Sequence, residues 1–105
     1  MTVRIPDNYV SGGFAMEYEV PWMTPGAVKR LDELVKSTDN VIEVGTGGST
    51  LFFARRAHSV IGIEPDMEWA DSVIQEASGR NINNAHIIAE SDPDRVLQIA
   101  GRLAA

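Results

Sequence analysis

The stretch Val41-Ile42-Glu43-Val44-Gly45-Thr46-Gly47-Gly48-Ser49-Thr50 decides the fold of this chain. Its first four residues are mostly β-branched and predict a short buried strand that ends at Gly45. The sequence that follows predicts a helix from Ser49 or Thr50 to about residue 58. Glycines between a strand and a helix let the backbone approach a ligand closely, and the helix start offers unpaired N–H groups. A ligand-binding loop is therefore expected, and the alternative is a tight turn that binds nothing.

The same alternation of strand and helix continues on both sides of this loop. Before it, Thr24-Pro25 and an apolar stripe predict a helix over residues 25–37. After it, strands are expected over 59–63 and 85–89, and helices over 66–78 and from Pro93 onward. Such an order predicts an α/β fold in which parallel strands are joined by right-handed crossovers and helices cover both faces of the sheet.

The first 23 residues have a different pattern. Alternating apolar side chains at positions 14, 16, 18 and 20 follow a Ser-Gly-Gly turn signal and have the spacing of a strand. The chain is therefore expected to divide into an N-terminal arm over residues 1–23, with a possible β-hairpin, and a ligand-binding unit over 24–105.

Composition limits the function classes. The chain has 105 residues, 9 Lys plus Arg against 15 Asp plus Glu, a net charge of −6 and no cysteine. One domain fits this length, and the acidic balance argues against nucleic acid as a partner. Disulfides and thiolate metal sites are excluded. No signal peptide or membrane span is expected, so the chain is interpreted as a soluble cytoplasmic protein.

The spacing within the glycine loop separates three kinds of ligand site. A phosphate-binding P-loop needs a lysine, which this loop lacks. A dinucleotide fingerprint needs glycine at its sixth position, where this chain has Thr50, so an NAD-type site is the weaker alternative. The pattern acid-x-Gly-x-Gly-x-small fits completely if Ser49 stands for the third glycine.

This chain resembles the class I S-adenosylmethionine-dependent methyltransferases over roughly residues 22 to 100. The resemblance rests on Glu43 with its glycine loop, on Glu64 at the end of the second strand and on Asp92 after the third. It implies a Rossmann-like three-layer α/β/α fold with about three core strands. It also implies that Glu43 faces the methionyl end of the cofactor, Glu64 the ribose hydroxyls and Asp92 the adenine.

The resemblance implies S-adenosylmethionine as the cofactor. The expected cofactor-binding residues are Glu43, Gly45, Thr46, Gly47, Ser49, Thr50, Glu64, Pro65, Met67 and Asp92. A carboxylate suits these roles because it accepts paired hydrogen bonds from a diol and complements a cation. Each acid also has a structural alternative, since Glu43 could be a paired buried acid and the other two could act at helix ends. Trp22 could either contact a ligand or fill the core.

The chain is expected to hold only the cofactor-binding half of such a domain, and its pattern indicates no catalytic residue and no acceptor. The favoured function is therefore a truncated or minimal methyltransferase. The alternative is a non-catalytic module that binds S-adenosylmethionine or a nucleotide. Because the strand at 41–44 would form an apolar edge, we expect a second copy, a completing chain or the N-terminal arm to cover it.

Overall fold

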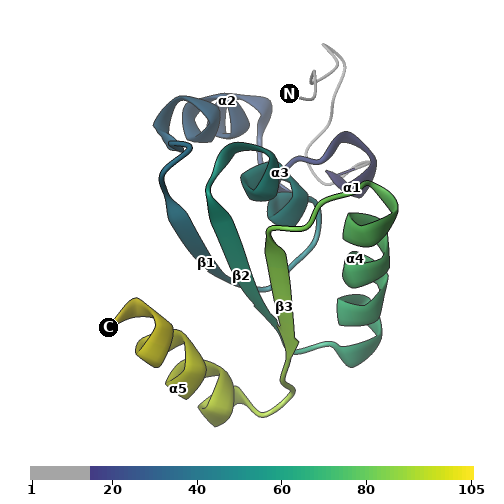
Figure 1. Ribbon diagram of the computed structural model, residues 1–105, viewed down its shortest axis with the longest axis vertical. Helices are drawn as coiled ribbons and strands as arrows, with labels where there is room; N and C mark the ends of the chain where they lie inside the picture. Colours follow the sequence, from purple (N-terminus) through teal and green to yellow (C-terminus); the bar gives the residue numbers. More distant parts are fainter. Residues whose placement is uncertain (1–14) are drawn as a thin grey trace.

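The computed structural model describes residues 15–105. Figure 1 shows a small parallel sheet with helices around it. In chain order the elements are α1 (Ala15–Tyr18), α2 (Pro25–Leu34), β1 (Asn40–Val44), α3 (Gly48–Arg56), β2 (Ser59–Glu64), α4 (Met67–Gly79), β3 (Ala85–Ala89) and α5 (Pro93–Ala104).

The described sheet has three strands in the order β1-β2-β3, and both neighbouring pairs are parallel. Val41 lies opposite Val60 in β2, and Val60 in turn lies opposite Ala85 in β3. With each crossover the chain moves one strand further across the sheet in the same direction. α3 and α4 each contact both β2 and β3, whereas α5 runs back across the sheet and contacts β1 (Figure 1). The predicted Rossmann-like α/β fold is confirmed.

Local sequence explains where the helices begin and end. The Thr24 hydroxyl accepts a hydrogen bond of 3.2 Å from the Ala27 N–H, and Pro25 occupies the first turn of α2. Asp66 caps α4 in the same way by accepting from the Trp69 N–H at 3.1 Å. α2 ends at Leu34, earlier than the predicted residue 37, because Val35 already has extended backbone angles.

Residues 15–20 are a correction to the predicted β-arm. Ala15–Tyr18 forms one helical turn, and the Val20 N–H then donates to the Ala15 carbonyl at 2.9 Å. The rest of the predicted arm lies outside the described residues. Val20 is fully buried and packs with Val28 and Phe52, which anchors this segment on α2 and α3.

Glu19 fixes the N-terminal segment to α3 and to the residue that follows α4. Its side chain is 3% exposed and accepts two hydrogen bonds from Arg55 of α3, at 2.8 and 2.9 Å, and one from Arg80 at 3.0 Å. The two guanidinium groups lower the pKa of Glu19, which shows that the surroundings favour its charged form. Its backbone has a φ of 56°, a strained value for a residue other than glycine.

β1 is an edge strand within the described part of the chain. Val44 at its end is 58% exposed, and Leu97 on α5 is 70% exposed. α5 buries only one residue, Val96. The interpretation that a second copy or a completing chain covers this edge stays a prediction. Among residues 15–105, no helix combines the length and the apolar character that crossing a bilayer requires.

Candidate functional site

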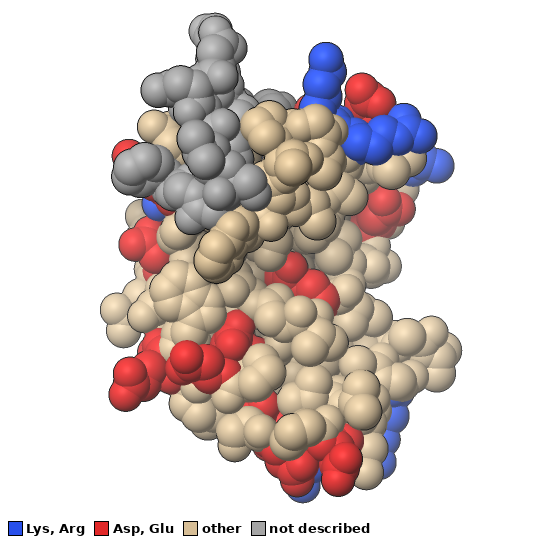
Figure 2. Space-filling model, turned by 180° about the vertical axis from the view of Figure 1, so that it is seen from behind, with Lys and Arg blue, Asp and Glu red and all other residues tan. Residues whose placement is uncertain are grey.

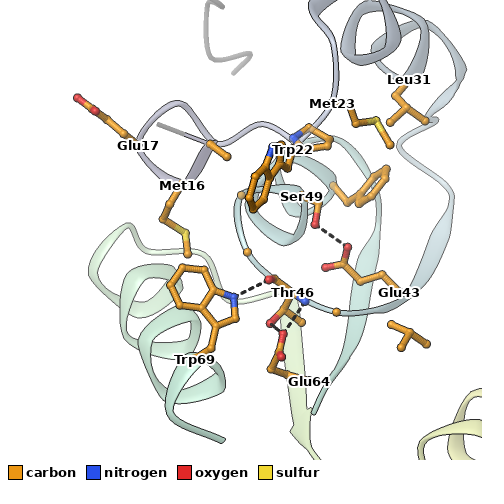
Figure 3. Close-up of a pocket in the computed structure, with 17 residues that line it drawn as sticks. Met16, Glu17, Trp22, Met23, Leu31, Glu43, Thr46, Ser49, Glu64 and Trp69 are labelled. Carbon is orange, nitrogen blue, oxygen red and sulfur yellow. Dashed lines mark hydrogen bonds between the residues drawn. The ribbon is translucent and has the colours of Figure 1, made fainter. Parts of the chain in front are cut away.

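A pocket of about 890 Å³ opens at the carboxyl ends of β1 and β2. Its floor is the loop that connects β1 to α3, and its wall is the segment over residues 15–23 (Figure 3). This is the edge at which open α/β sheets bind ligands. The lining residues are Ala15, Met16, Glu17, Pro21, Trp22, Met23, Leu31, Glu43, Val44, Gly45, Thr46, Gly47, Gly48, Ser49, Phe53, Glu64 and Trp69.

The Glu43 carboxylate is held in place by two hydroxyl groups of α3. Ser49 donates to one of its oxygens at 2.8 Å, and Thr50 donates to the other. Figure 3 shows the Glu43 side chain pointing from β1 toward Ser49. Burial raises the pKa of Glu43 above its ordinary value of 4.5, the two hydrogen bonds oppose this rise, and the charge of Glu64 adds to it. A cation bound beside Glu43 would therefore stabilise an ionised form that the pocket alone disfavours.

This raised pKa leads to a prediction for the Glu43→Gln variant. The folded chain binds the Glu43 proton more tightly than the unfolded chain, so this group stabilises the fold below pH 4.5. The contribution is lost as the pH rises from 4.5 through the raised pKa. Gln mimics the protonated acid at every pH. We therefore expect the stability of the unaltered chain, relative to Glu43→Gln, to fall as the pH rises.

The measurement is urea unfolding of both proteins between about pH 4 and 8. The compared quantity is the difference in unfolding free energy between the two proteins. Glu19, whose pKa is lowered, makes the stability of both proteins rise with pH, and this contribution cancels in the difference. A difference that stays constant or grows with pH would show that Glu43 is not destabilised by burial.

The glycine loop depends on two glycines for different reasons. Gly45 has a φ of 86°, which a side chain rarely tolerates, and its N–H donates to the Ile63 carbonyl at 2.8 Å. Gly62 lies opposite Glu43 in the sheet, and a Cβ there would stand 2.5 Å from the Thr46 methyl group. A glycine within a strand marks such a close approach, so Gly62 is a supporting residue behind the loop that sequence reasoning missed.

Glu64 ties the glycine loop to the end of β2. One of its oxygens accepts hydrogen bonds from both the N–H and the hydroxyl of Thr46, each at 2.7 Å. The other oxygen accepts from the Asp66 N–H at 3.0 Å. The residue is only 6% exposed and still lines the pocket. Glu64 is therefore both a structural acceptor for the loop and a group that a ligand can reach.

Trp69 is a second site residue that the sequence reasoning missed. Its indole N–H donates to the Thr46 carbonyl at 2.7 Å, and its ring lies 3.6 Å from the position that a Cβ on Gly47 would take. In Figure 3 the indole of Trp69 reaches from α4 toward the glycine loop, opposite Glu43. The sequence signal was an aromatic residue in the acidic first turn of α4, just after Glu64.

The structure places the other predicted residues as follows. Gly45, Thr46, Gly47 and Ser49 line the pocket together with both glutamates. Thr50 is fully buried behind the loop, where its hydroxyl also accepts from the Gly47 N–H at 3.1 Å.

Pro65 and Met67 are exposed and are not among the lining residues. Asp92 caps α5 by accepting from the Asp94 N–H at 3.0 Å and does not line the pocket. Its contact with a cofactor stays a prediction.

No family model matches the chain, and no curated protein matches it significantly. Several solved structures are similar to it, including the following two. A dimethyladenosine transferase from Plasmodium falciparum is 26% identical, with a TM-score of 0.54, over 63% of this chain and 26% of that chain. The 23S rRNA methyltransferase ErmE is 25% identical, with a TM-score of 0.51, over 65% of this chain and 29% of that chain.

One of these structures is a dimethyladenosine transferase and the other an rRNA methyltransferase, so the resemblance to methyltransferases expected from the sequence is confirmed. The region of likeness spans less than a third of either protein's own length. It therefore concerns a methyltransferase-like unit rather than a whole enzyme.

Proposed function

We propose that this pocket binds S-adenosylmethionine and that the chain is the cofactor-binding part of a methyltransferase. One observation carries the proposal. Glu43 and Glu64 lie at the carboxyl ends of neighbouring strands and line one pocket, with the glycine loop between them. The similarity to two methyltransferases supports the same function.

The hydrogen-bonding capacity of Glu64 fits one ribose hydroxyl directly. A carboxylate offers about four acceptor positions, and Glu64 uses three of them for Thr46 and Asp66. A second ribose hydroxyl is accommodated if the Thr46 hydroxyl rotates and exchanges its partner. Glu64 would thus bind the sugar while Thr46 keeps its backbone bond to the same carboxylate.

Glu43 fits the other end of the ligand. Its carboxylate is partly buried beside Gly45 and Ser49, and a positive charge there would offset the burial that raises its pKa. Bound S-adenosylmethionine supplies a methyl group on a positively charged sulfur. Glu43 attracts and orients that end of the ligand, and the wall over residues 15–23 limits the access of water.

The direct test is titration calorimetry of the chain with S-adenosylmethionine, S-adenosylhomocysteine and NAD. We expect saturable binding of the first two, and a stabilisation of about 2.7 kcal/mol at 100 times the dissociation constant. NAD is the control, and we expect no binding because its pyrophosphate would face two carboxylates. The absence of both heat and thermal shift with the first two ligands at millimolar concentration would refute the proposal.

A binding module without transfer activity is the second candidate. The observation that favours it is that both pocket carboxylates already accept hydrogen bonds from the protein, so neither is poised as a base. A transfer assay with labelled S-adenosylmethionine on a candidate acceptor separates the two functions, because only the enzyme yields labelled product.

A further inference from the structure

Large apolar side chains are exposed around the mouth of the pocket. Trp22 is 78% exposed, Val44 58% and Met23 41%, and all three line the pocket together with Leu31. Figure 3 shows Trp22 above the glycine loop, on the opposite side of the pocket from Glu64. An exposed apolar patch of this kind beside a polar floor is typical of a binding site. It lies beyond the residues that the proposed cofactor would use.

The charged side chains that line the pocket are acidic. Among the lining residues between 15 and 105, the charged side chains are Glu17, Glu43 and Glu64, and none is basic. Figure 3 shows Glu17 pointing away from the pocket, so Glu43 and Glu64 set the charge of its floor. Arg55 and Arg80, which contact the wall through Glu19, are both ion-paired with that residue.

The surface around the pocket repeats this pattern. In Figure 2, Asp and Glu side chains spread over the middle and the lower part of the face shown, whereas most Lys and Arg side chains gather at the upper right, over α2. A phosphate-bearing molecule would approach this face against the field of its carboxylates, whereas a cation would be attracted.

We propose, building on the function proposed above, that the second ligand of this pocket is a small, positively charged aromatic amine that stacks on Trp22. An indole attracts a cation or a flat ring at its face, and Trp is the strongest side chain for this interaction. The net negative charge of the pocket floor attracts the ammonium group, and S-adenosylhomocysteine, which has no net charge, leaves this negative charge in place when it contacts Glu43 and Glu64. We expect nucleic acid to bind more weakly than such an amine, because no basic side chain among the described lining residues could hold its phosphates.

Three probes of the same ring system test this proposal: tryptamine, indole and indole-3-acetate, which carry a positive, zero and negative charge. The chain has two tryptophans, Trp22 and Trp69, and both line the pocket, so two indole N–H signals in an NMR spectrum report binding. The titrations are run without and with saturating S-adenosylhomocysteine. We expect tryptamine to bind at least tenfold more tightly than indole-3-acetate, with indole between them, and to shift the Trp22 signal in both conditions.

Two variants test whether tryptamine binding depends on Trp22. Trp22→Ala should weaken tryptamine binding at least fivefold and leave the affinity for S-adenosylhomocysteine within twofold, since Trp22 is exposed and supports little packing. Leu97→Ala is the matched control, because Leu97 is 70% exposed on α5 and does not line the pocket. It should change neither affinity.

The outcomes separate this proposal from the proposed function. If S-adenosylhomocysteine binds but the three probes bind equally, or a short RNA binds more tightly than tryptamine, only the acceptor class is overturned. If tryptamine binds through Trp22 and S-adenosylhomocysteine does not bind, only the cofactor assignment fails. If neither ligand shifts an indole signal, both are overturned.

Discussion

Replacing Gly48 with Ala should destabilise the chain by about 3 kcal/mol, toward the upper end of the cost of overpacking a core. A Cβ at Gly48 would stand 2.2 Å from the Val20 carbonyl oxygen and 2.4 Å from that of Ala15. Both obstacles are backbone atoms, so no side-chain rotation relieves the clash. The N-terminal segment must move away from α3, and the pocket loses its wall. Thermal unfolding should show a melting temperature lower by roughly 15 °C.

Gly26→Ala is the matched control for this substitution. Gly26 lies in the first turn of α2, and nothing stands within 4 Å of the position of its Cβ. Alanine is the better helix former, so this variant should be unchanged or more stable by up to about 1 kcal/mol. Equal melting temperatures for the two variants would mean that the segment over residues 15–20 does not pack on Gly48.

Glu64→Gln should lower both stability and ligand affinity. Glutamine has one acceptor oxygen, and its amide nitrogen would face the N–H of either Thr46 or Asp66, which now donate to the carboxylate. One buried donor is left unsatisfied and the charge-assisted bonds are lost, at a cost of about 3 kcal/mol in unfolding free energy. The affinity for S-adenosylhomocysteine should fall by a factor of about 30 or more, since the loop and the diol contact both depend on this carboxylate.

Urea unfolding and calorimetry measure the two effects separately. Glu68→Gln is the control, because Glu68 is an exposed acid in the first turn of α4 and does not line the pocket. It should cost no more than about 0.5 kcal/mol. An unchanged affinity for Glu64→Gln together with reduced stability would assign Glu64 a purely structural role.

The parts of the fold and site that could be predicted from the sequence are those encoded locally. The β-branched run before Gly45 and the alternation of helix and strand predicted the sheet, which the structure confirms. Glu43, Glu64 and the glycine loop meet in one pocket because the carboxyl ends of neighbouring parallel strands lie at the same edge.

The features that the sequence did not predict depend on contacts between residues far apart in the chain. The alternating side chains at Met16, Tyr18 and Val20 predicted a strand, but residues 15–18 form a helical turn. The buried ion pairs of Glu19 with arginines far along the chain hold that segment, and no local pattern encodes them. Met67 is exposed in the first turn of α4 and its predicted contact with a cofactor stays a prediction, whereas Trp69 two residues later reaches the loop. The orientation of a helix around its axis, which depends on packing, decides between these two residues.

The ion pairs of Glu19 also determine when the pocket can form during folding. They join positions 36 and 61 residues apart, Glu19 with Arg55 and Glu19 with Arg80. Closing such long loops has an entropic cost that must be offset before the contacts stabilise the chain. We therefore expect the contacts of Glu19 in residues 15–23 to form after α3 and α4 have packed on the sheet. We expect the floor of the pocket to stay open on a ribosome-bound chain until Arg80 has emerged, so the complete pocket would form late in synthesis rather than at the first collapse.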